Sequence, residues 1–268
     1  MPYSLKGRNV LVTGGSRGLG ALIAEKFAAE GANVVVNYVT SKERAVEVAE
    51  KIKTDYGVKA HVLQADIGVI AESQKLVKDT VELLGGLDVI INNAGWTRFA
   101  TFGDINDLSH DEWNKCWSTN VMSHLVLLQE AAPIFNANPD GGVFLISSSV
   151  AGITTGGSSM GYAVTKAAGL HLMKCMAFTQ GPKIRLNAVL PGLLLTEWGQ
   201  KYGEDRIKAN INMTALKHET YLDDCADAFI ASAKNTSQTG QQIVVGRSHS
   251  RHDESHPLTL QDAGLVIK

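Results

Sequence analysis

Residues 9–20 read NVLVTGGSRGLG, and this stretch decides the fold. The apolar run that opens it is typical of a buried strand, and the alanine-rich stretch at 21–30 is typical of a helix. Between them, Gly14, Gly18 and Gly20 form a Gly-x-x-x-Gly-x-Gly loop. Glycines let the backbone turn sharply and approach a pyrophosphate, which binds the amides and positive dipole of a helix N-terminus. The stretch therefore predicts a strand, a phosphate-binding loop and a helix, although a purely structural turn would use the same residues.

Two further apolar runs end in small polar residues. Residues 87–95 read LDVIINNAG, and residues 143–149 read VFLISSS. The carboxyl ends of parallel strands line the ligand crevice of an α/β sheet, so we expect the Asn-Asn-Ala-Gly turn and Ser149 to face that crevice. Ser149 would there donate a hydrogen bond to a substrate oxygen. Taken alone, each segment is equally consistent with an ordinary turn.

Tyr162 and Lys166 lie four residues apart in the run MGYAVTK, which is expected to be helical. Positions i and i+4 share one face of a helix, so the spacing places an ammonium beside a phenol. A nearby cation favours the phenolate, and we therefore expect the pKa of Tyr162 to fall toward neutral. Such a phenol can exchange a proton with a carbonyl or alcohol. The same pair recurs on many solvated helices, so its meaning depends on the other segments.

Taken together, these segments resemble the short-chain dehydrogenase/reductase family over nearly the whole chain. The resemblance rests on the glycine loop, the Asn-Asn-Ala-Gly turn, the run IRLNAVLPG at 184–192, and Ser149 with Tyr162 and Lys166. In that family the serine, tyrosine and lysine are catalytic, and an asparagine in the preceding long helix completes a proton relay.

Asn120 occupies the position that matches this asparagine. It lies within a mostly apolar helical stripe that includes Trp113, Trp117, Val121 and His124. A buried amide needs hydrogen-bond partners, so Asn120 is also consistent with a satisfied core residue. The resemblance instead implies a kinked helix and a bound water.

The resemblance further implies cofactor contacts from the glycine loop, the strand ends and the segment after the 184–192 run. The implied cofactor-binding residues are Gly14, Ser16, Arg17, Gly18, Leu19, Asn37, Ser41, Asp66, Ile67, Asn93, Ala94, Gly95, Tyr162, Lys166, Pro191, Gly192, Leu194 and Thr196. Asp66 and Ile67 match the family's adenine contact, although an aspartate at that place is also an ordinary helix N-cap.

The end of the second strand indicates which nicotinamide cofactor is used. An acidic residue there would bind the adenosine ribose hydroxyls and repel a 2′-phosphate, but this chain has Asn37 and Tyr38. Basic and hydroxyl residues lie close by in the sequence, namely Arg17, Ser41, Lys42 and Arg44. An arginine fork binds phosphate well, so we expect NADP(H) rather than NAD(H). Lys42 and Arg44 are also consistent with a solvated helix face.

The mechanism that the resemblance implies is direct hydride transfer. Tyr162 donates its proton to the carbonyl oxygen during reduction, and Ser149 orients and polarises that oxygen. Lys166 lowers the pKa of Tyr162 and holds the nicotinamide-ribose hydroxyls. Asn120 anchors a water that links Lys166 to solvent.

The sequence gives less information about the substrate than about the cofactor. Residues 193–202 resemble the family's substrate lid, and Trp198 and Tyr202 lie within it. Trp96 follows the Asn-Asn-Ala-Gly turn. Trp96 and Trp198 as substrate contacts, with Ser149 and Tyr162, would suit an apolar or aromatic ketone. Both tryptophans are equally consistent with packing residues.

Apolar runs alternate with amphipathic stretches along the chain. The expected strands are 9–12, 34–36, 60–64, 87–92, 143–147, 184–189 and 242–245, and the expected helices between and after them include 21–30, 42–53, 72–84 and 222–233. This alternation predicts one doubly wound, Rossmann-like parallel sheet with helices on both faces. Residues 1–246 are expected to form an NADP-binding catalytic domain, and residues 247–268 a polar tail.

Composition limits the partners. The chain has 268 residues and a net charge of −2, so electrostatics favours neither nucleic acid nor an anionic membrane. No apolar run approaches the ~18 residues of a membrane helix, and the first residues lack a signal-peptide core. Its three cysteines have no metal or disulfide spacing. We expect a cytoplasmic enzyme that acts on a small carbonyl or alcohol, binds no metal, and forms a homodimer or homotetramer.

The C-terminal segment departs from the family. The family's usual Val-Asp-Gly-Gly end is replaced by Val244-Val245-Gly246 and a polar run. Three histidines there, His249, His252 and His256, suggest a solvated tail more than a metal site. The departure puts in doubt the subunit contacts and the part of the pocket wall usually made there. It also keeps open an alternative function, an NADP-binding protein without redox turnover that serves as a sensor, scaffold or non-redox catalyst.

Overall fold

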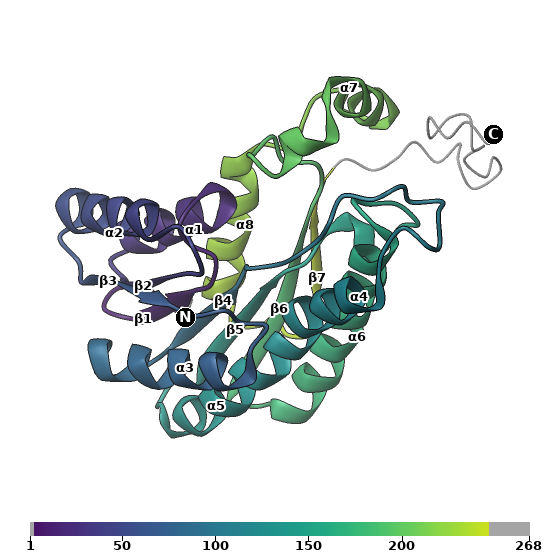
Figure 1. The fold of residues 1–268 in the computed structure, drawn as a ribbon. Coiled ribbons are helices and arrows are strands. Elements are labelled where there is room, and N and C mark those ends of the chain that lie inside the picture. Colours follow the sequence, from purple (N-terminus) through teal and green to yellow (C-terminus); the bar gives the residue numbers. More distant parts are fainter. Residues whose placement is uncertain (1–2, 247–268) are drawn as a thin grey trace.

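The computed structural model describes residues 3–246, and these form one sheet of seven parallel strands (Figure 1). The strands are β1 (Asn9–Val12), β2 (Asn33–Tyr38), β3 (Ala60–Gln64), β4 (Val89–Asn92), β5 (Gly142–Ser147), β6 (Ile184–Pro191) and β7 (Gln242–Val245). Their order across the sheet is β3-β2-β1-β4-β5-β6-β7. The order reverses between β1 and β4, so the doubly wound topology is confirmed and the ligand crevice is expected at the carboxyl ends of these two strands.

Helices cover both faces of the sheet (Figure 1). One face carries α1 (Gly18–Ala29), α2 (Lys42–Tyr56) and α8 (Leu222–Lys234), and the other carries α3 (Ile70–Leu84), α5 (Ser123–Ala137) and α6 (Met160–Gln180). Each face has its own buried hydrophobic cluster. Val10 and Val12 of β1 belong to the first cluster and Leu11 to the second, because successive side chains of a strand point to opposite faces.

The remaining helices connect these layers. The helix expected around Asn120 is divided into α4 (His110–Trp117), a π-helical turn η1 (Ser118–Met122) and α5. Short 3-10 turns occur at η2 (Val150–Gly152) and η3 (Gly199–Tyr202). One helix without an apolar stripe in the sequence, α7 (Glu204–Met213), buries none of its residues and stands away from the sheet (Figure 1).

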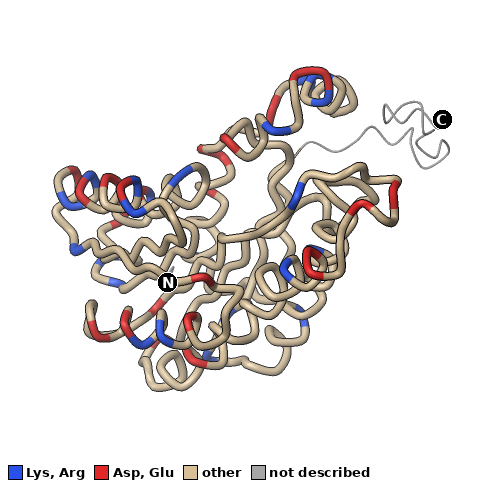
Figure 2. Tube along the Cα trace, viewed as in Figure 1, with Lys and Arg blue, Asp and Glu red and all other residues tan. Residues whose placement is uncertain are grey.

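Charges of both signs are interspersed along α2 and α7 (Figure 2). In the part of the chain that the structure describes, no helix is both long and apolar enough to cross a membrane. The polar tail at 247–268 and its three histidines lie outside the described residues.

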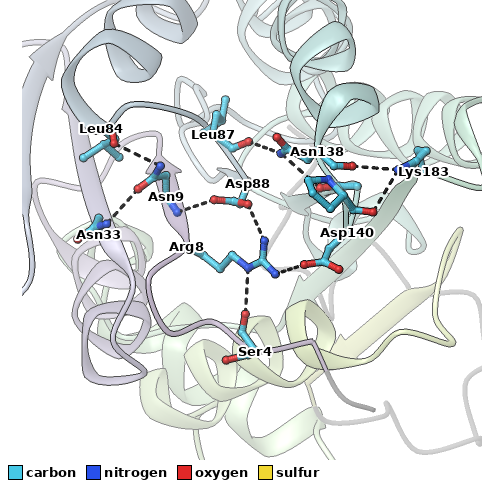
Figure 3. Close-up of polar contacts among 12 residues, drawn as sticks. Ser4, Arg8, Asn9, Asn33, Leu84, Leu87, Asp88, Asn138, Asp140 and Lys183 are labelled. Atoms are coloured by element: carbon cyan, nitrogen blue, oxygen red, sulfur yellow. Dashed lines mark hydrogen bonds and ion pairs between the residues drawn. The ribbon is translucent and has the colours of Figure 1, made fainter.

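A polar cluster joins the amino ends of the strands (Figure 3). Arg8 donates to an Asp88 carboxylate oxygen at 3.0 Å and also pairs with Asp140. The second Asp88 oxygen accepts from the backbone N–H of Asn9 at 2.9 Å. Lys183 donates to the backbone oxygen of Asn138 at 2.9 Å, and further bonds extend to Ser4, Asn33, Leu84, Leu87 and Pro139. We call these residues the amino-edge cluster; it ties β1, β4, β5 and β6 together at the edge opposite the crevice.

Candidate active site

Thr13 and Asn93 connect the glycine loop to the Asn-Asn-Ala-Gly turn at the carboxyl edge. The Thr13 hydroxyl donates to Asn92 Oδ1 at 2.9 Å and accepts from the backbone N–H groups of Asn93 and Ala94, each at 3.0 Å. Asn93 Nδ2 donates to the backbone oxygen of Thr13 at 3.1 Å. The structure therefore brings these two predicted segments into direct contact, and it uses the Asn93 side chain to hold them.

The start of α1 has the features of an anion site. A Cβ on Gly20 would lie 2.3 Å from the Gly14 oxygen, so only glycine lets the helix approach the loop this closely. The N-cap residue is Arg17, and no side chain caps the helix. By contrast, α4 is closed by a capping box of Ser109 and Glu112. The first amides of α1 are therefore left for a ligand.

Asn37 corrects one expectation. We expected it to contact the cofactor, but its side chain is fully buried and bonded to the protein. Its Oδ1 accepts from the N–H of Gly14 at 3.2 Å, and its Nδ2 donates to the backbone oxygens of Leu63 and Ala65 at 3.2 and 3.1 Å. The Asn37 side chain therefore fixes the glycine loop and the end of β3, and the hydrogen-bonding atoms of this side chain are engaged within the protein.

Asp66 lies at the end of β3, where the adenine contact is expected. Its Oδ1 accepts from the N–H of Gly68 at 2.9 Å, while Ile67 beside it is buried. The residue that caps α3 is Val69, so the N-cap alternative for Asp66 is wrong. Ser41 occupies the N-cap position of α2, and its side chain makes no capping bond there.

The predicted catalytic side chains meet beyond β5. Ser159 caps α6 by accepting from the N–H of Tyr162 at 3.1 Å. One turn later, Lys166 Nζ lies 5.4 Å from the centre of the Tyr162 ring and donates to the backbone oxygen of Ser147 at 2.8 Å. The Ser149 hydroxyl lies close enough to the Tyr162 phenol to lower its pKa. The serine, tyrosine and lysine thus lie within one small volume, as the resemblance implies.

Burial dominates the ionisation of this group. It raises the pKa of Tyr162, and the nearby Ser149 hydroxyl only partly opposes the rise. It lowers the pKa of Lys166 to about 8. The expectation that Lys166 draws the pKa of Tyr162 toward neutral is therefore wrong for the polypeptide itself. The phenol keeps its proton at pH 7, while most of the Lys166 population stays charged.

Asn120 lies in the π-helical turn and is fully buried. Its Oδ1 accepts from the N–H of Trp96 at 2.8 Å, and its Nδ2 donates to the Trp96 oxygen at 2.9 Å and to Thr165 Oγ1 at 3.0 Å. Thr165 in turn donates to the backbone oxygen of Tyr162 at 2.9 Å. A Cβ on Gly95 would lie 3.3 Å from Asn120 Oδ1 and 3.5 Å from Lys166 Nζ, so the amide and the ammonium flank this glycine. The wider turn thus brings Asn120 between the Asn-Asn-Ala-Gly turn and α6.

Aromatic rings line the approach to Tyr162. The ring of Trp198 lies 6.1 Å from that of Tyr162 and 6.4 Å from that of Phe99. Phe99 also packs edge-on against Tyr202 at 4.9 Å. The Trp96 ring lies 5.5 Å from Lys115 Nζ of α4, and its backbone N–H donates to Asn120, so its contact with the substrate stays a prediction. Phe99, which carries no sequence motif, belongs to the aromatic wall with Trp198 and Tyr202.

The lid segment, residues 193–202, crosses above the glycine loop. A Cβ on Gly18 would lie 3.4 Å from Thr196 Cγ2. Pro191 ends β6, and the N–H of Gly192 donates to the Val245 oxygen at 2.9 Å. Leu194 packs against the first hydrophobic cluster. Thr196 therefore lies over the loop, as the resemblance implies. Its neighbour Glu197 belongs to no sequence motif and pairs with Arg17 and Arg44.

Comparison with known proteins agrees with this geometry. The sequence profile of the short chain dehydrogenase family matches residues 8–207. The 3-oxoacyl-acyl-carrier-protein reductase FabG of Staphylococcus aureus is 34% identical over 241 residues, which cover 89% of this chain and 96% of FabG.

Two solved structures show the same fold. A short chain dehydrogenase of Burkholderia cenocepacia in complex with NADP has a TM-score of 0.83 and 31% identity, with 91% of this chain and 98% of that chain covered. A 7 alpha-hydroxysteroid dehydrogenase complexed with NADH and 7-oxo glycochenodeoxycholic acid has a TM-score of 0.83 and 30% identity, with 93% and 98% covered. On the profile match, the identity to FabG and the shared architecture, the chain belongs to the short-chain dehydrogenase family of oxidoreductases.

Proposed function

We propose that this protein is an NADP(H)-dependent oxidoreductase that reduces a ketone, or oxidises the matching secondary alcohol, with Tyr162 as the general acid or base. One observation carries the proposal: a buried lysine and a half-buried tyrosine lie 5.4 Å apart, ammonium to ring centre, beside the hydroxyl of Ser149. Within residues 3–246, Lys166 forms no ion pair, and its hydrogen bond is to one backbone carbonyl. A cation buried in this way destabilises the fold, and its presence is accounted for by chemistry at Tyr162.

The residues at the carboxyl edge suit a nicotinamide dinucleotide. The uncapped amides at Gly18 and Leu19 would hold the pyrophosphate, and Asp66 with Ile67 the adenine. Arg17 and Arg44 would hold a 2′-phosphate, and Lys166 the nicotinamide-ribose hydroxyls. Ser16, Ser41, Ala94, Pro191 and Thr196 complete the proposed contacts. When bound, the cofactor supplies or accepts the hydride.

Tyr162 would carry the proton. Because burial raises its pKa, the phenol is protonated at pH 7, the form required to donate to a carbonyl oxygen. Ser149 would hold that oxygen through its hydroxyl. Once the proton has left, the Lys166 ammonium stabilises the phenolate beside it.

Asn120 would act by position. Its three side-chain hydrogen bonds fix the backbone of Trp96 and the hydroxyl of Thr165, and through them the turn at Gly95 and the start of α6. Lys166 Nζ lies directly across Gly95 from this amide. The water that we expect Asn120 to anchor stays a prediction.

The substrate proposed is a ketone with an apolar or aromatic group next to the carbonyl. The rings of Phe99, Trp198 and Tyr202 form the wall that faces Tyr162, and such a wall binds flat apolar groups well. The likeness to a 3-oxoacyl reductase adds a second chemical class, the 3-oxoacyl thioester, in which the ketone is flanked by an acyl chain.

A turnover assay tests the proposal. Purified protein is mixed with NADPH or NADH and with aryl alkyl ketones, 3-oxoacyl thioesters of N-acetylcysteamine or matching secondary alcohols, and the absorbance of the reduced cofactor is followed. We expect oxidation of NADPH with at least one ketone class, and slower oxidation of NADH. Tight NADPH binding without turnover on every substrate would favour the cofactor-binding protein without redox activity.

A further inference from the structure

The lid segment is tied to the two arginines expected to bind the 2′-phosphate. Glu197 Oε2 lies 3.2 Å from Arg17 Nη1, and Glu197 Oε1 lies 2.6 Å from Arg44 Nη1. Arg17 is the N-cap residue of α1, and Arg44 is in the first turn of α2. One carboxylate from the lid segment therefore bridges the starts of α1 and α2.

The bridge has the chemistry of a bound phosphate. A carboxylate and a phosphate monoester both offer oxygens that accept from guanidinium N–H groups. The two arginines present those groups close to the end of β2, where this chain has Asn37 and Tyr38 and no carboxylate. The anion that holds the arginines together in the polypeptide therefore comes from the lid, about 160 residues further along the chain.

We propose that Glu197 is a selectivity residue that competes with the cofactor's 2′-phosphate for Arg17 and Arg44, so that phosphate binding releases the lid. The inference rests on the proposed function, because it takes these arginines as the 2′-phosphate site. A dinucleotide without the phosphate leaves the bridge intact, whereas one with the phosphate must displace Glu197.

The release has a structural consequence. Trp198 follows Glu197, and the centre of its ring lies 6.1 Å from that of the Tyr162 ring, with the planes tilted by 50°. Loss of the bridge would therefore act on the backbone next to a side chain that contacts the proposed proton donor. The two events are thermodynamically linked. The free energy with which the Glu197 bridge holds the lid segment in place is therefore lost from the free energy of phosphate binding.

Hydrogen–deuterium exchange of the peptide covering 193–202 tests the release in full-length protein. Two adenosine fragments serve as ligands: adenosine 2′,5′-bisphosphate, and 5′-AMP, which lacks the 2′-phosphate. We expect the bisphosphate to speed exchange of this peptide severalfold and 5′-AMP to leave it unchanged. In the variant Glu197→Gln the exchange should be fast without ligand and should not increase further.

The affinities for the two adenosine fragments provide an independent test of the competition between Glu197 and the 2′-phosphate. Exposed ion pairs are individually weak, so we expect Glu197→Gln to bind the bisphosphate about threefold to tenfold more tightly than wild type while 5′-AMP binding stays within twofold. Arg44→Gln should also speed lid exchange but should weaken bisphosphate binding. The control is Glu204→Gln, which removes the same charge from a carboxylate whose partner is Lys208 at 3.7 Å, and it should match wild type in both measurements.

Two results would overturn the inference. One is a lid exchange rate that the bisphosphate leaves unchanged or slows; the other is a Glu197→Gln variant with wild-type affinity. Both differ from failure of the proposed function, in which neither NADPH nor the bisphosphate binds wild-type protein at any accessible concentration. In that case the exchange of Glu197→Gln without ligand would still report whether the bridge holds the lid.

Discussion

The charged side chains at the two edges of the sheet differ in how fully they are paired. At the amino edge, the Asp88 carboxylate has both oxygens occupied, by Arg8 and by the N–H of Asn9 (Figure 3). At the carboxyl edge, the buried Lys166 is bonded to one carbonyl, and the half-buried Tyr162 lies beside it. Satisfied charges stabilise a fold, whereas a buried cation without a counter-ion destabilises it. The contrast indicates that the amino edge maintains the fold and the carboxyl edge is kept for chemistry.

The largest effect expected is at the carboxyl edge. Replacing Tyr162 with Phe removes the proposed proton donor and should lower kcat for ketone reduction about 10²- to 10⁴-fold. The NADPH dissociation constant and the unfolding midpoint should change little, because the ring and its packing remain. Absorbance kinetics with a fluorescence titration of NADPH measures both.

Tyr56→Phe is the matched control, since Tyr56 lies at the end of α2 and is 38% exposed. It should behave as wild type. A Tyr162→Phe enzyme that keeps more than a tenth of the wild-type kcat would contradict the proton-donor role.

The amino edge should show the reverse pattern. Asp88→Ala removes the acceptor for Arg8 and for the Asn9 N–H, and should lower the free energy of unfolding by about 2–3 kcal/mol. Activity per folded molecule should not change. Urea denaturation measures the first quantity, and active-site titration normalises the second.

Asp140→Ala provides the comparison within the same cluster. The Asp140 side chain is 56% exposed, so its loss should cost less than about 1 kcal/mol. An equal loss for both variants would show that burial at Asp88 contributes nothing.

Lys166→Met should stabilise the protein while abolishing turnover. The lowering of its pKa from 10.5 to about 8 corresponds to a penalty of about 3 kcal/mol at pH 7. Loss of the hydrogen bond to Ser147 offsets about 1 kcal/mol, so the free energy of unfolding should rise by about 2 kcal/mol. Denaturation of wild type and variant at pH 7 measures the difference.

The pH dependence of the free energy of unfolding tests the sign of the contribution of Lys166. Between pH 8 and 10.5 the unfolded chain holds a proton on Lys166 that the folded protein has lost, so the stability of wild type from this group rises with pH. The advantage of Lys166→Met should therefore shrink over that range. Lys174→Met, at an exposed position on α6, is the matched control. A Lys166→Met variant that is less stable than wild type at pH 7 would contradict the view of Lys166 as a destabilising cation.

The smallest effect expected concerns the aromatic wall. Phe99→Leu keeps the apolar volume but removes the ring contacts with Trp198 and Tyr202, each worth about 1 kcal/mol. We expect KM for an aryl ketone to rise about threefold to tenfold, with the NADPH dissociation constant unchanged. An aliphatic ketone of similar size serves as the control substrate. Equal changes for the two substrates would show that the ring sets volume only.

The fold was largely predictable, because each buried strand is a short apolar run that ends at a turn. The run at 9–12 became β1 with those bounds, and 60–64 became β3. By contrast, α7 was not predicted, because a helix that buries no residue leaves no apolar stripe in the sequence. The division of the helix at Asn120 was expected only as a kink, since a π-helical turn has no sequence signature of its own.

The site was predictable where chemistry fixes residue identity and not where packing decides. Ser149, Tyr162 and Lys166 came together as expected. The contacts of the Asn37 side chain could not be predicted, because its bonds join the glycine loop after β1 to the end of β3 and depend on how these strands pack. The pKa of Tyr162 was misjudged because a four-residue spacing reveals the nearby charge but not the depth of burial.

The π-helical turn at 118–122 also limits how the chain can change in length. Such a turn holds one residue more than an α-helical turn. Deleting one residue there would let α4 run straight into α5 with regular i to i−4 bonds, and it would rotate Asn120 away from Gly95 by about 100°. Loss of a single codon would thus give a more regular helix. The amide of Asn120 would then no longer lie opposite Lys166. Among short deletions that keep the fold, those in this turn should be the ones that inactivate the protein without unfolding it.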